Sequence, residues 1–423
     1  MTHKNEWAPR PPMGWNSWDC YGAGVTEEAV RGNADYMAKY LKPFGWEYVV
    51  VDIQWSEPTI KGWDYHPFAE LNMDEYSRLI PAENRFPSSA GGKGFAPLSE
   101  YVHSLGLKFG IHIMRGIPRQ AVHRNTALLG TEKTARQIAQ RYSVCPWNTD
   151  MYGVEYCEAG QRYYDSLFEL YASWGVDYVK VDDIANTEFK PHDPYSAEKE
   201  IEMIRHAIDA CGRPIVLSLS PGPAPLDHAW HLCQNANLWR MTGDFWDGWK
   251  QLYNVFERCE KWAPYVGGGC WPDCDMLPLG KLLAGDPHGA HMTNFTRDEQ
   301  ITLMSLWCIF RAPLMMGGEM RDNDDFTLAL LTNAEALKIN QTGGRPRQLF
   351  RTAEEAAWLN TAEGKTCIGL FNLSDAERAV SAEVPASDGT AFADVWTDRP
   401  AEVSGGRLSF TLPPHGAVLM MQR

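Results

Sequence analysis

Two segments of the sequence place carboxylates close to cations where apolar runs end. The first, YVKVDDIAN, carries Lys180, Asp182 and Asp183, and the second, NLWRMTGD, carries Arg240 and Asp244. Because side chains alternate between the faces of a strand, Lys180 and Asp182 share one face and Asp183 takes the other. A carboxylate beside a cation stays ionised, as a nucleophile must, and a carboxyl in a less polar position keeps its proton and can act as an acid. Asp182 and Asp244 therefore form the minimal set of groups for cleavage of a glycosidic bond.

Other polar and aromatic residues occupy the same position, at the ends of further apolar runs. They are Trp18, Asp19, Asp52, Trp55, His112, Arg115, Ser220, Asp273 and Asp275. Each has a structural alternative, because a single Asp at a strand end is more often a helix cap and a lone His is more often a hydrogen-bonded internal residue. Each Trp is as compatible with a core position as with a surface for a sugar ring. The combination of several carboxylates and aromatic side chains at strand ends favours a sugar-binding site.

The apolar runs that carry these residues alternate with helical patterns over most of the chain. Helix ends are recognisable, with Thr26 as an N-cap and Gly175 as a C-cap. Eight strand-then-helix units in series predict an α/β fold, the (β/α)8 TIM barrel, whose sites lie at the carboxyl ends of the strands. An open doubly wound sheet is the alternative, and the lack of a G-x-G-x-x-G turn after the first strand disfavours it. The strands are expected at 13–18, 48–55, 107–114, 176–183, 214–220, 237–244, 274–280 and 312–319.

The pattern changes after residue 341. Short apolar or alternating runs follow, separated by turn residues, and they read EAAWLN, TCIGLFNL, RAVSAEV, AFADVW, RLSFTL and GAVLMM. This pattern predicts a small antiparallel β-sandwich. We therefore expect two domains, a catalytic (β/α)8 barrel over 1–341 and a C-terminal β-sandwich domain over 342–423.

Composition and charge exclude several classes of partner. The net charge of −15 would repel phosphate backbones, so we expect no nucleic-acid partner. No run approaches the ~20 apolar residues of a membrane span, so no membrane partner is expected either. The N-terminal MTHKNEWAPRPP lacks the apolar core of a signal peptide. A cytoplasmic protein is therefore expected, although a secreted protein without its leader would look the same.

The cysteines indicate neither a disulfide framework nor a metal site. All 10 are scattered, mostly within apolar runs, which favours reduced and buried thiols. The closest pair, Cys270 and Cys274 in CWPDC, offers too few ligands at tight spacing for a metal ion. We therefore expect no metal, and nothing in the sequence calls for an organic cofactor.

The order of the motifs resembles that of glycoside hydrolase family 27, the α-galactosidase (melibiase) family. Several ordered motifs are more specific than any single one, and together they extend over essentially the whole chain. In chain order they are PPMGWNSWDCYG (11–22), YVVVDIQW (48–55), DYVKVDD (177–183), WRMTGDFWDGW (239–249), GGGCWPDCDMLPLG (267–280), APLMMGGEMR (312–321) and LKINQ (337–341).

This resemblance implies a retaining hydrolase with a carbohydrate substrate, in which Asp182 is the nucleophile and Asp244 the acid/base. For this stereochemistry the two carboxyl groups should lie about 5–5.5 Å apart. Asp52 would bind hydroxyls of the terminal sugar, and Trp18 would pack on its apolar face. The other residues expected to contact the substrate are Trp55, His112 (where the family often has Tyr), Lys180, Ser220, Arg240 and Asp275.

The sequence departs from the family pattern in two places. The family usually has two aspartates after the second strand, where this chain has Asp52 followed by Ile53, and SLSPGP replaces a Cys-Glu-Trp type segment after the fifth strand. An isoleucine cannot accept hydrogen bonds from the O4 and O6 region of galactose, and a site that loses such a group loses discrimination for that hydroxyl. A terminal α-D-galactose-like sugar is the first candidate. A β-L-arabinopyranoside, which lacks the C6 hydroxymethyl group, is the alternative within the family.

Two functions of other kinds are compatible with parts of the sequence. A Schiff-base lyase or aldolase would use Lys180 with a depressed pKa, which the neighbouring carboxylates oppose. A non-catalytic sugar-binding protein, with its binding surface in the β-sandwich, would not need the carboxylate pair. Barrel glycosidases often assemble into homo-oligomers, and the sequence leaves the oligomeric state open.

Overall fold

Eight parallel strands form one sheet within the residues that this computed structural model describes, 4–187 and 195–423. Their order in space is β10-β9-β8-β7-β3-β2-β1-β13, and every neighbouring pair is parallel. Leu277, just after β10, pairs in parallel with Met316 of β13, so the sheet curls round and its two ends meet. The predicted (β/α)8 barrel is confirmed. Its strands are β1 (Met13–Asn16), β2 (Tyr48–Val51), β3 (Lys108–Met114), β7 (Tyr178–Thr187), β8 (Val216–Gly222), β9 (Leu238–Arg240), β10 (Trp271–Asp273) and β13 (Leu314–Met316).

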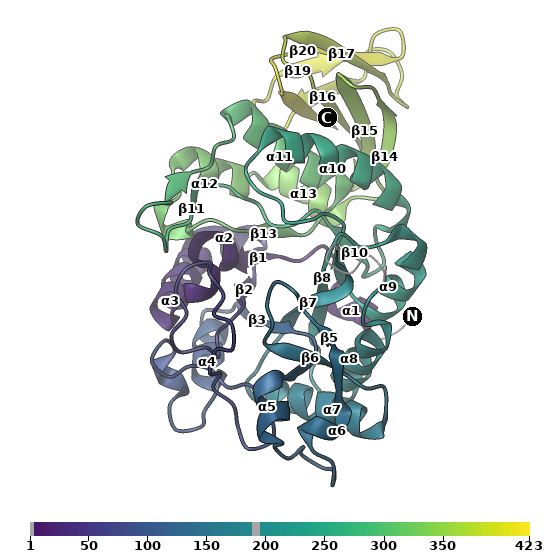
Figure 1. The fold of residues 1–423 in the computed structure, drawn as a ribbon. Coiled ribbons are helices and arrows are strands. Elements are labelled where there is room, and N and C mark those ends of the chain that lie inside the picture. The colour runs from purple at the N-terminus through teal and green to yellow at the C-terminus, as the bar shows by residue number, and fades with distance from the viewer. Residues whose placement is uncertain (1–3, 188–194) are drawn as a thin grey trace.

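The helices cover the outside of this barrel (Figure 1). The predicted N-cap is present, because the Thr26 side chain accepts a hydrogen bond from the backbone N–H of Ala29. Gly175 follows α7 with φ +79°, which is the left-handed conformation that ends helices. The helices are α1 (Lys4–Trp7), α2 (Trp18–Tyr21), α3 (Glu27–Tyr36), α4 (Ala96–Ser104), α5 (Arg119–Arg124), α6 (Ala135–Ile138), α7 (Glu158–Ser173), α8 (Glu198–Ala210), α9 (Ala229–Asn235), α10 (Trp249–Trp262), α11 (Arg297–Phe310), α12 (Asp325–Leu331) and α13 (Ala334–Thr342).

Several barrel strands are shorter than predicted or displaced. The second strand, β2, ends at Val51 rather than 55. The seventh strand, expected at 274–280, is β10, which ends at Asp273. The chain turns there because the backbone N–H of Asp275 donates to Asp273 Oδ1 and Asp275 adopts φ +80°. The sixth strand, β9, ends at Arg240 rather than 244. Strand alternation therefore does not extend to Thr242 and Asp244.

Small sheets that the sequence did not predict elaborate the loops after the barrel strands. One contains β4 (Ile117–Pro118), β5 (Ala139–Val144) and β6 (Met151–Val154), in the order β4-β6-β5, and follows β3. Another pairs β11 (Lys281–Leu282) with β12 (His291–Met292). The described residues contain no helix that is both long and apolar enough to cross a bilayer.

The C-terminal strands form two antiparallel sheets. One has the order β14-β15-β16-β21-β18-β19, the other pairs β17 with β20, and apolar side chains fill the space between them. The predicted β-sandwich is confirmed, and β14 and β19 are strands that the sequence analysis missed. Their bounds are β14 (Arg347–Arg351), β15 (Glu355–Ala362), β16 (Lys365–Asn372), β17 (Arg378–Glu383), β18 (Ala391–Asp394), β19 (Pro400–Glu402), β20 (Arg407–Leu412) and β21 (Ala417–Gln422).

The larger C-terminal sheet packs its second face against the barrel helices α10, α11 and α13 (Figure 1). In β16, Ile368 and Leu370 point into the sandwich, whereas Cys367 and Phe371 join the core that the barrel helices share. Asn360 donates to the backbone carbonyl of Ile309 across the same contact, at 2.7 Å. Because one apolar core runs from the barrel into this sheet, the division at 341/342 stays a prediction.

Replacing Phe371 should show how strongly the two parts stabilise each other. Phe371 is fully buried, and its ring lies 5.0 Å from that of Phe256 of α10 in an edge-to-face arrangement. Phe371→Ala is expected to lower the free energy of unfolding by roughly 3–5 kcal/mol, as cavities in cores do. Denaturant unfolding followed by tryptophan fluorescence measures this. Phe68→Ala, at a ring that is 80% exposed, is the control and should cost less than about 0.5 kcal/mol. Equal costs at both sites would contradict the packing.

Candidate active site

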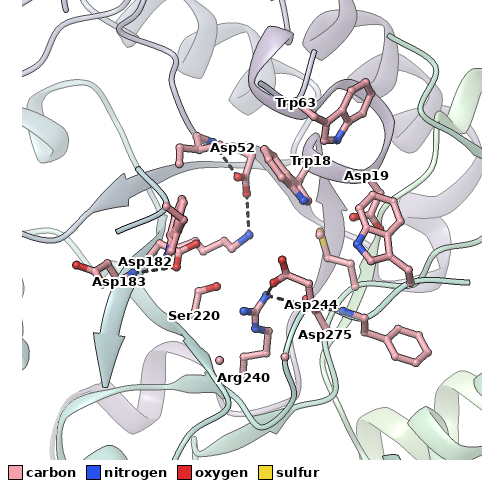
Figure 2. A pocket seen from close by; sticks show the side chains of 18 of the residues that line it. Trp18, Asp19, Asp52, Trp63, Asp182, Asp183, Ser220, Arg240, Asp244 and Asp275 are labelled. Atoms are coloured by element: carbon pink, nitrogen blue, oxygen red, sulfur yellow. Dashed lines mark hydrogen bonds and ion pairs between the residues drawn. The ribbon is translucent and has the colours of Figure 1, made fainter. Parts of the chain in front are cut away.

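A cavity of about 530 Å³ lies at the carboxyl ends of the barrel strands, and Figure 2 shows the side chains that surround it. Most of the residues predicted to act on a substrate meet there. The lining residues are Trp18, Asp19, Asp52, Ile53, Trp63, Tyr65, Trp147, Lys180, Asp182, Asp183, Asn186, Ser220, Gly222, Arg240, Gly243, Asp244, Phe245, Trp246, Asp275 and Met276.

Asp52 and Lys180 form an ion pair on the cavity wall, with Lys180 Nζ 2.9 Å from Asp52 Oδ2. Asn16 Nδ2 donates to the same oxygen at 2.8 Å, and the N–H of Ile53 donates to Oδ1. Burial opposes ionisation of Asp52, but Lys180 and His112 outweigh it and hold its pKa well below the usual range. Asp52 is therefore ionised and can act as a hydrogen-bond acceptor in the cavity wall. Asn16, which the sequence analysis did not select, fixes its orientation.

Asp182 is held ionised by the charge of Lys180, as expected, and by further partners. His112 Nε2 lies 3.3 Å from Asp182 Oδ2, and the backbone N–H of Asp183 donates to Oδ1 at 2.8 Å. Burial works against ionisation, yet the contact with His112 and the charges of Lys180 and Arg240 lower the pKa of Asp182. The ammonium group of Lys180 donates its hydrogen bond to Asp52, and its charge also acts on Asp182. A lowered pKa and a position on the cavity wall suit a nucleophile.

Asp183 points away from its neighbour and belongs to a buried ion network. Arg115 Nη2 lies 2.7 Å from Asp183 Oδ2, and Arg115 Nη1 lies 3.0 Å from Glu200 Oε1. Tyr164 donates its hydroxyl to the other oxygen of Glu200. The backbone of Asp183 has φ +52°, a strained conformation for a residue other than glycine, and this network holds it there. The adjacent aspartates thus have different roles, since one faces the cavity and the other fixes the strand end.

Arg240 connects two further carboxylates across the cavity. Its Nη1 lies 2.6 Å from Asp244 Oδ1 and 3.4 Å from Asp275 Oδ2. Asp275 is buried and also accepts the N–H of Phe245 at 2.9 Å. The side chain of Asp244 is 65% exposed. The less polar surroundings that we expected for the acid are therefore not present around Asp244 in this structure.

Some predicted residues lie outside the cavity. Trp55 is buried behind its wall, where the indole N–H donates to the backbone carbonyl of His112 and the ring packs on Phe95. His112 is also buried and reaches the cavity only through Asp182. Trp55 and His112 support the site rather than forming its surface.

Ser220 and several aromatic residues add to the cavity surface. Ser220 Oγ is buried and has no hydrogen-bond partner among the described residues, which suits the predicted substrate contact. Trp18 stacks on Tyr65, with 6.2 Å between ring centroids, and Tyr65 packs in turn on Trp147. The indole N–H of Trp63 is also without a partner in the described chain. Tyr65, Trp63 and Trp147 lie in long loops without periodic pattern, so no sequence signal distinguished them from core aromatics.

Among the described residues, the cysteines and one acidic cluster lie outside the cavity lining. Cys270 lies near Lys4, and Cys274 packs on Cys259 with 3.7 Å between sulfurs, so the CWPDC pair does not converge. In the described residues one group has side chains close enough to share an ion: Glu198, Glu202 and His231. It lies on α8 and α9, away from the cavity, and Lys199 already pairs with Glu202 at 2.8 Å.

Comparisons with known proteins agree with this arrangement. The α-galactosidase A family matches residues 149–342. The α-galactosidase of Cyamopsis tetragonoloba is 28% identical over 96% of this chain and 84% of its own. A β-L-arabinopyranosidase of glycoside hydrolase family 27 from Geobacillus stearothermophilus, also solved with arabinose, is 57% identical, with a TM-score of 0.96 over 99% of this chain and 98% of that one. A putative α-N-acetylgalactosaminidase from Bacillus halodurans is 52% identical, with a TM-score of 0.87 over 97% of each chain.

Asp273, beneath the cavity, should make the stability of the fold depend on pH. Burial and the nearby charge of Asp275 raise the pKa of Asp273 to about 7. An unfolded Asp titrates near 3.9, so the folded state binds this proton more tightly, and stability falls as the pH rises from about 4 to about 7. Asp273→Asn removes the charge, and its side-chain oxygen can still accept the N–H of Asp275.

The variant is expected to match the wild type near pH 4 and to exceed its free energy of unfolding by roughly 2–4 kcal/mol above about pH 7. Equilibrium unfolding over this range measures the difference. Asp64→Asn, at an exposed position, is the control and should change little at any pH. A difference for Asp273→Asn that stays constant with pH would contradict the raised pKa.

Proposed function

The chain belongs to glycoside hydrolase family 27, and from this premise we propose that it is a retaining exo-glycosidase that releases terminal β-L-arabinopyranosyl residues. Of the two sugars that the sequence leaves open, galactose and arabinopyranose, the second is favoured by one observation. That observation is the apolar side chain of Ile53 in the cavity wall, next to Asp52.

Ile53 gives this part of the cavity an apolar surface. It is 3% exposed and belongs to an apolar cluster with Met114, Cys145 and Met151. The hydroxymethyl group of a galactoside would place a hydroxyl against this surface, where it loses hydrogen bonds to water and gains none. An arabinopyranose ring has only hydrogen at that carbon. The solved relative that is 57% identical and is named a β-L-arabinopyranosidase supports this choice.

The remaining polar groups would hold the other hydroxyls of the ring. Asp52 is an ionised acceptor, and Lys180 uses one of its three N–H donors on Asp52, which leaves the others for the sugar. Ser220 Oγ supplies an unpartnered hydroxyl at the end of β8. Trp18 offers an indole face on which the apolar side of a pyranose can pack.

The two displacement steps follow from the carboxylates that face this ring. Asp182 attacks the anomeric carbon, the bond to the leaving oxygen breaks, and that oxygen takes the proton of Asp244. Asp244, now ionised, then takes a proton from water as the water oxygen bonds to the anomeric carbon and releases Asp182. Two inversions at one carbon restore the starting configuration.

Asp244 must carry a proton when the substrate is bound, although Arg240 lies 2.6 Å away. The side chain of Asp244 is exposed to the cavity, where the leaving oxygen of a bound substrate can reach it.

A set of nitrophenyl glycosides tests the choice of sugar. The wild type is expected to have a kcat/KM for the β-L-arabinopyranoside at least about tenfold above that for the α-D-galactoside, with the α-N-acetylgalactosaminide as a third arm. Ile53→Asp places an acceptor at the hydroxymethyl position and should raise the galactoside-to-arabinopyranoside ratio at least about tenfold. Ile53→Val, which keeps the wall apolar, is the matched control. A wild type that prefers the galactoside, with a ratio unchanged by Ile53→Asp, would refute the proposed specificity.

The adjacent aspartates allow a matched test of the nucleophile. Asp182→Asn is expected to lower kcat by at least about 10⁴-fold, because no other side chain can form the glycosyl-enzyme bond. Asp183→Asn weakens the ion pair with Arg115, so it should lower stability and leave kcat within about tenfold. Adding azide to Asp182→Gly should yield a glycosyl azide of inverted configuration, detectable by NMR. Normal turnover in Asp182→Asn would end the assignment.

A further inference from the structure

Asp19 is a buried carboxyl group in the cavity wall that no residue of the described chain hydrogen-bonds. It lies in α2, directly after Trp18, and is 1% exposed. Its Oδ2 is completely enclosed and has no donor within reach. Its backbone carbonyl is satisfied, since the N–H of Leu283 donates to it at 2.8 Å. Figure 2 shows Asp19 on the opposite side of the view from Asp182.

The fold reserves space for this side chain at the end of β13. A Cβ atom on Gly317 would lie 2.0 Å from Asp19 Oδ2 and 2.6 Å from its Cγ, so only glycine at 317 admits the carboxyl group. Gly317 does not adopt a positive φ, so its backbone conformation does not require glycine. The close approach of Asp19 is therefore the reason for glycine at this position.

The surroundings of Asp19 favour the neutral acid. Burial and the carboxylates of Asp275, Asp52 and Asp244 raise its pKa well above the usual value, and Lys180 opposes them only in part. An ionised carboxylate without hydrogen bonds in such a position would be far more costly than the neutral acid. The neutral acid is the form in which a carboxyl group can donate a hydrogen bond in an active site.

The proton of Asp19 has no acceptor in the described chain. Oδ2 is enclosed, so we place the proton on Oδ1, toward the cavity. Oδ2 is then a carbonyl-type oxygen, and it is the one atom of the carboxyl group that stays without a partner among the described residues. We propose that Asp19 is a further substrate-binding residue, a neutral hydrogen-bond donor to a hydroxyl oxygen of the bound pyranose. The inference rests on the proposed function only in that the cavity holds a sugar.

This role complements that of Asp52. A sugar hydroxyl can donate one hydrogen bond and accept others, and an ionised carboxylate such as Asp52 can only accept. A neutral Asp19 supplies a donor that carries no charge. The site thereby recognises both the hydrogen and the lone pairs of the hydroxyl groups.

Kinetics of two variants test the donor. Asp19→Ala removes it and is expected to lower kcat/KM for the β-L-arabinopyranoside by roughly 10–100-fold, because a substrate hydroxyl is left without its partner. Asp19→Asn keeps an N–H donor of the same size and is expected to lose at most about threefold. Neither variant should lower the unfolding temperature, since each removes an unpaired buried acid. Wild-type kcat/KM in Asp19→Ala would overturn the proposal.

Infrared spectroscopy tests the proton directly, without turnover. The difference spectrum between wild type and Asp19→Asn at neutral pH should contain the C=O stretch of a protonated carboxyl, and this band should shift when L-arabinose is added. Absence of the band, or a band that L-arabinose does not move, would overturn the proposal. If the wild type cleaves none of the glycosides, the proposed function fails, and the band with its response to the free sugar still decides the role of Asp19.

Discussion

Repulsion between carboxyl groups is the constraint on which the site depends. The carboxyl ends of parallel strands meet at one mouth, and in the described chain they bring Asp19, Asp52, Asp182, Asp183, Asp244 and Asp275 to a single cavity. Two cations, Lys180 and Arg240, share that cavity with them. Two cations cannot neutralise six ionised carboxylates in partly buried positions. Some of these acids must therefore pair with other groups or stay protonated.

The structure meets this constraint by giving each acid a different environment. Asp52 forms an ion pair with Lys180, and Asp244 forms one with Arg240. Asp183 pairs with Arg115, so it does not depend on the two cations of the cavity. Asp19 accepts no hydrogen bond from the described residues, and its pKa is raised. The position of each aspartate thus decides its environment, and on the proposed function this gives the same carboxyl group the roles of acceptor, nucleophile, proton donor and structural anchor.

The sequence predicts the barrel and the core of the site because both depend on regular patterns. Apolar runs ending in polar residues located Asp52 and Asp182, since carboxyl ends of parallel strands converge whatever the loops do. Asp275 was located by the family resemblance, because its strand was predicted in the wrong place. Prediction failed where regularity stops. Strand alternation could not place Trp55, which follows the end of β2, and the neutral state of Asp19 depends on enclosure by Gly317, a residue about 300 positions away.

The same balance of charge bears on why Ile53 is tolerated beside Asp52. A second carboxylate at this position would add a negative charge to a cavity whose two cations are already engaged. Its neighbours, Met114 and Met151, could neither hydrogen-bond it nor neutralise it. An apolar residue here relieves repulsion and at the same time removes the acceptor for a hydroxymethyl group. Specificity for a ring without that group is therefore consistent with the balance of charge in the whole cavity.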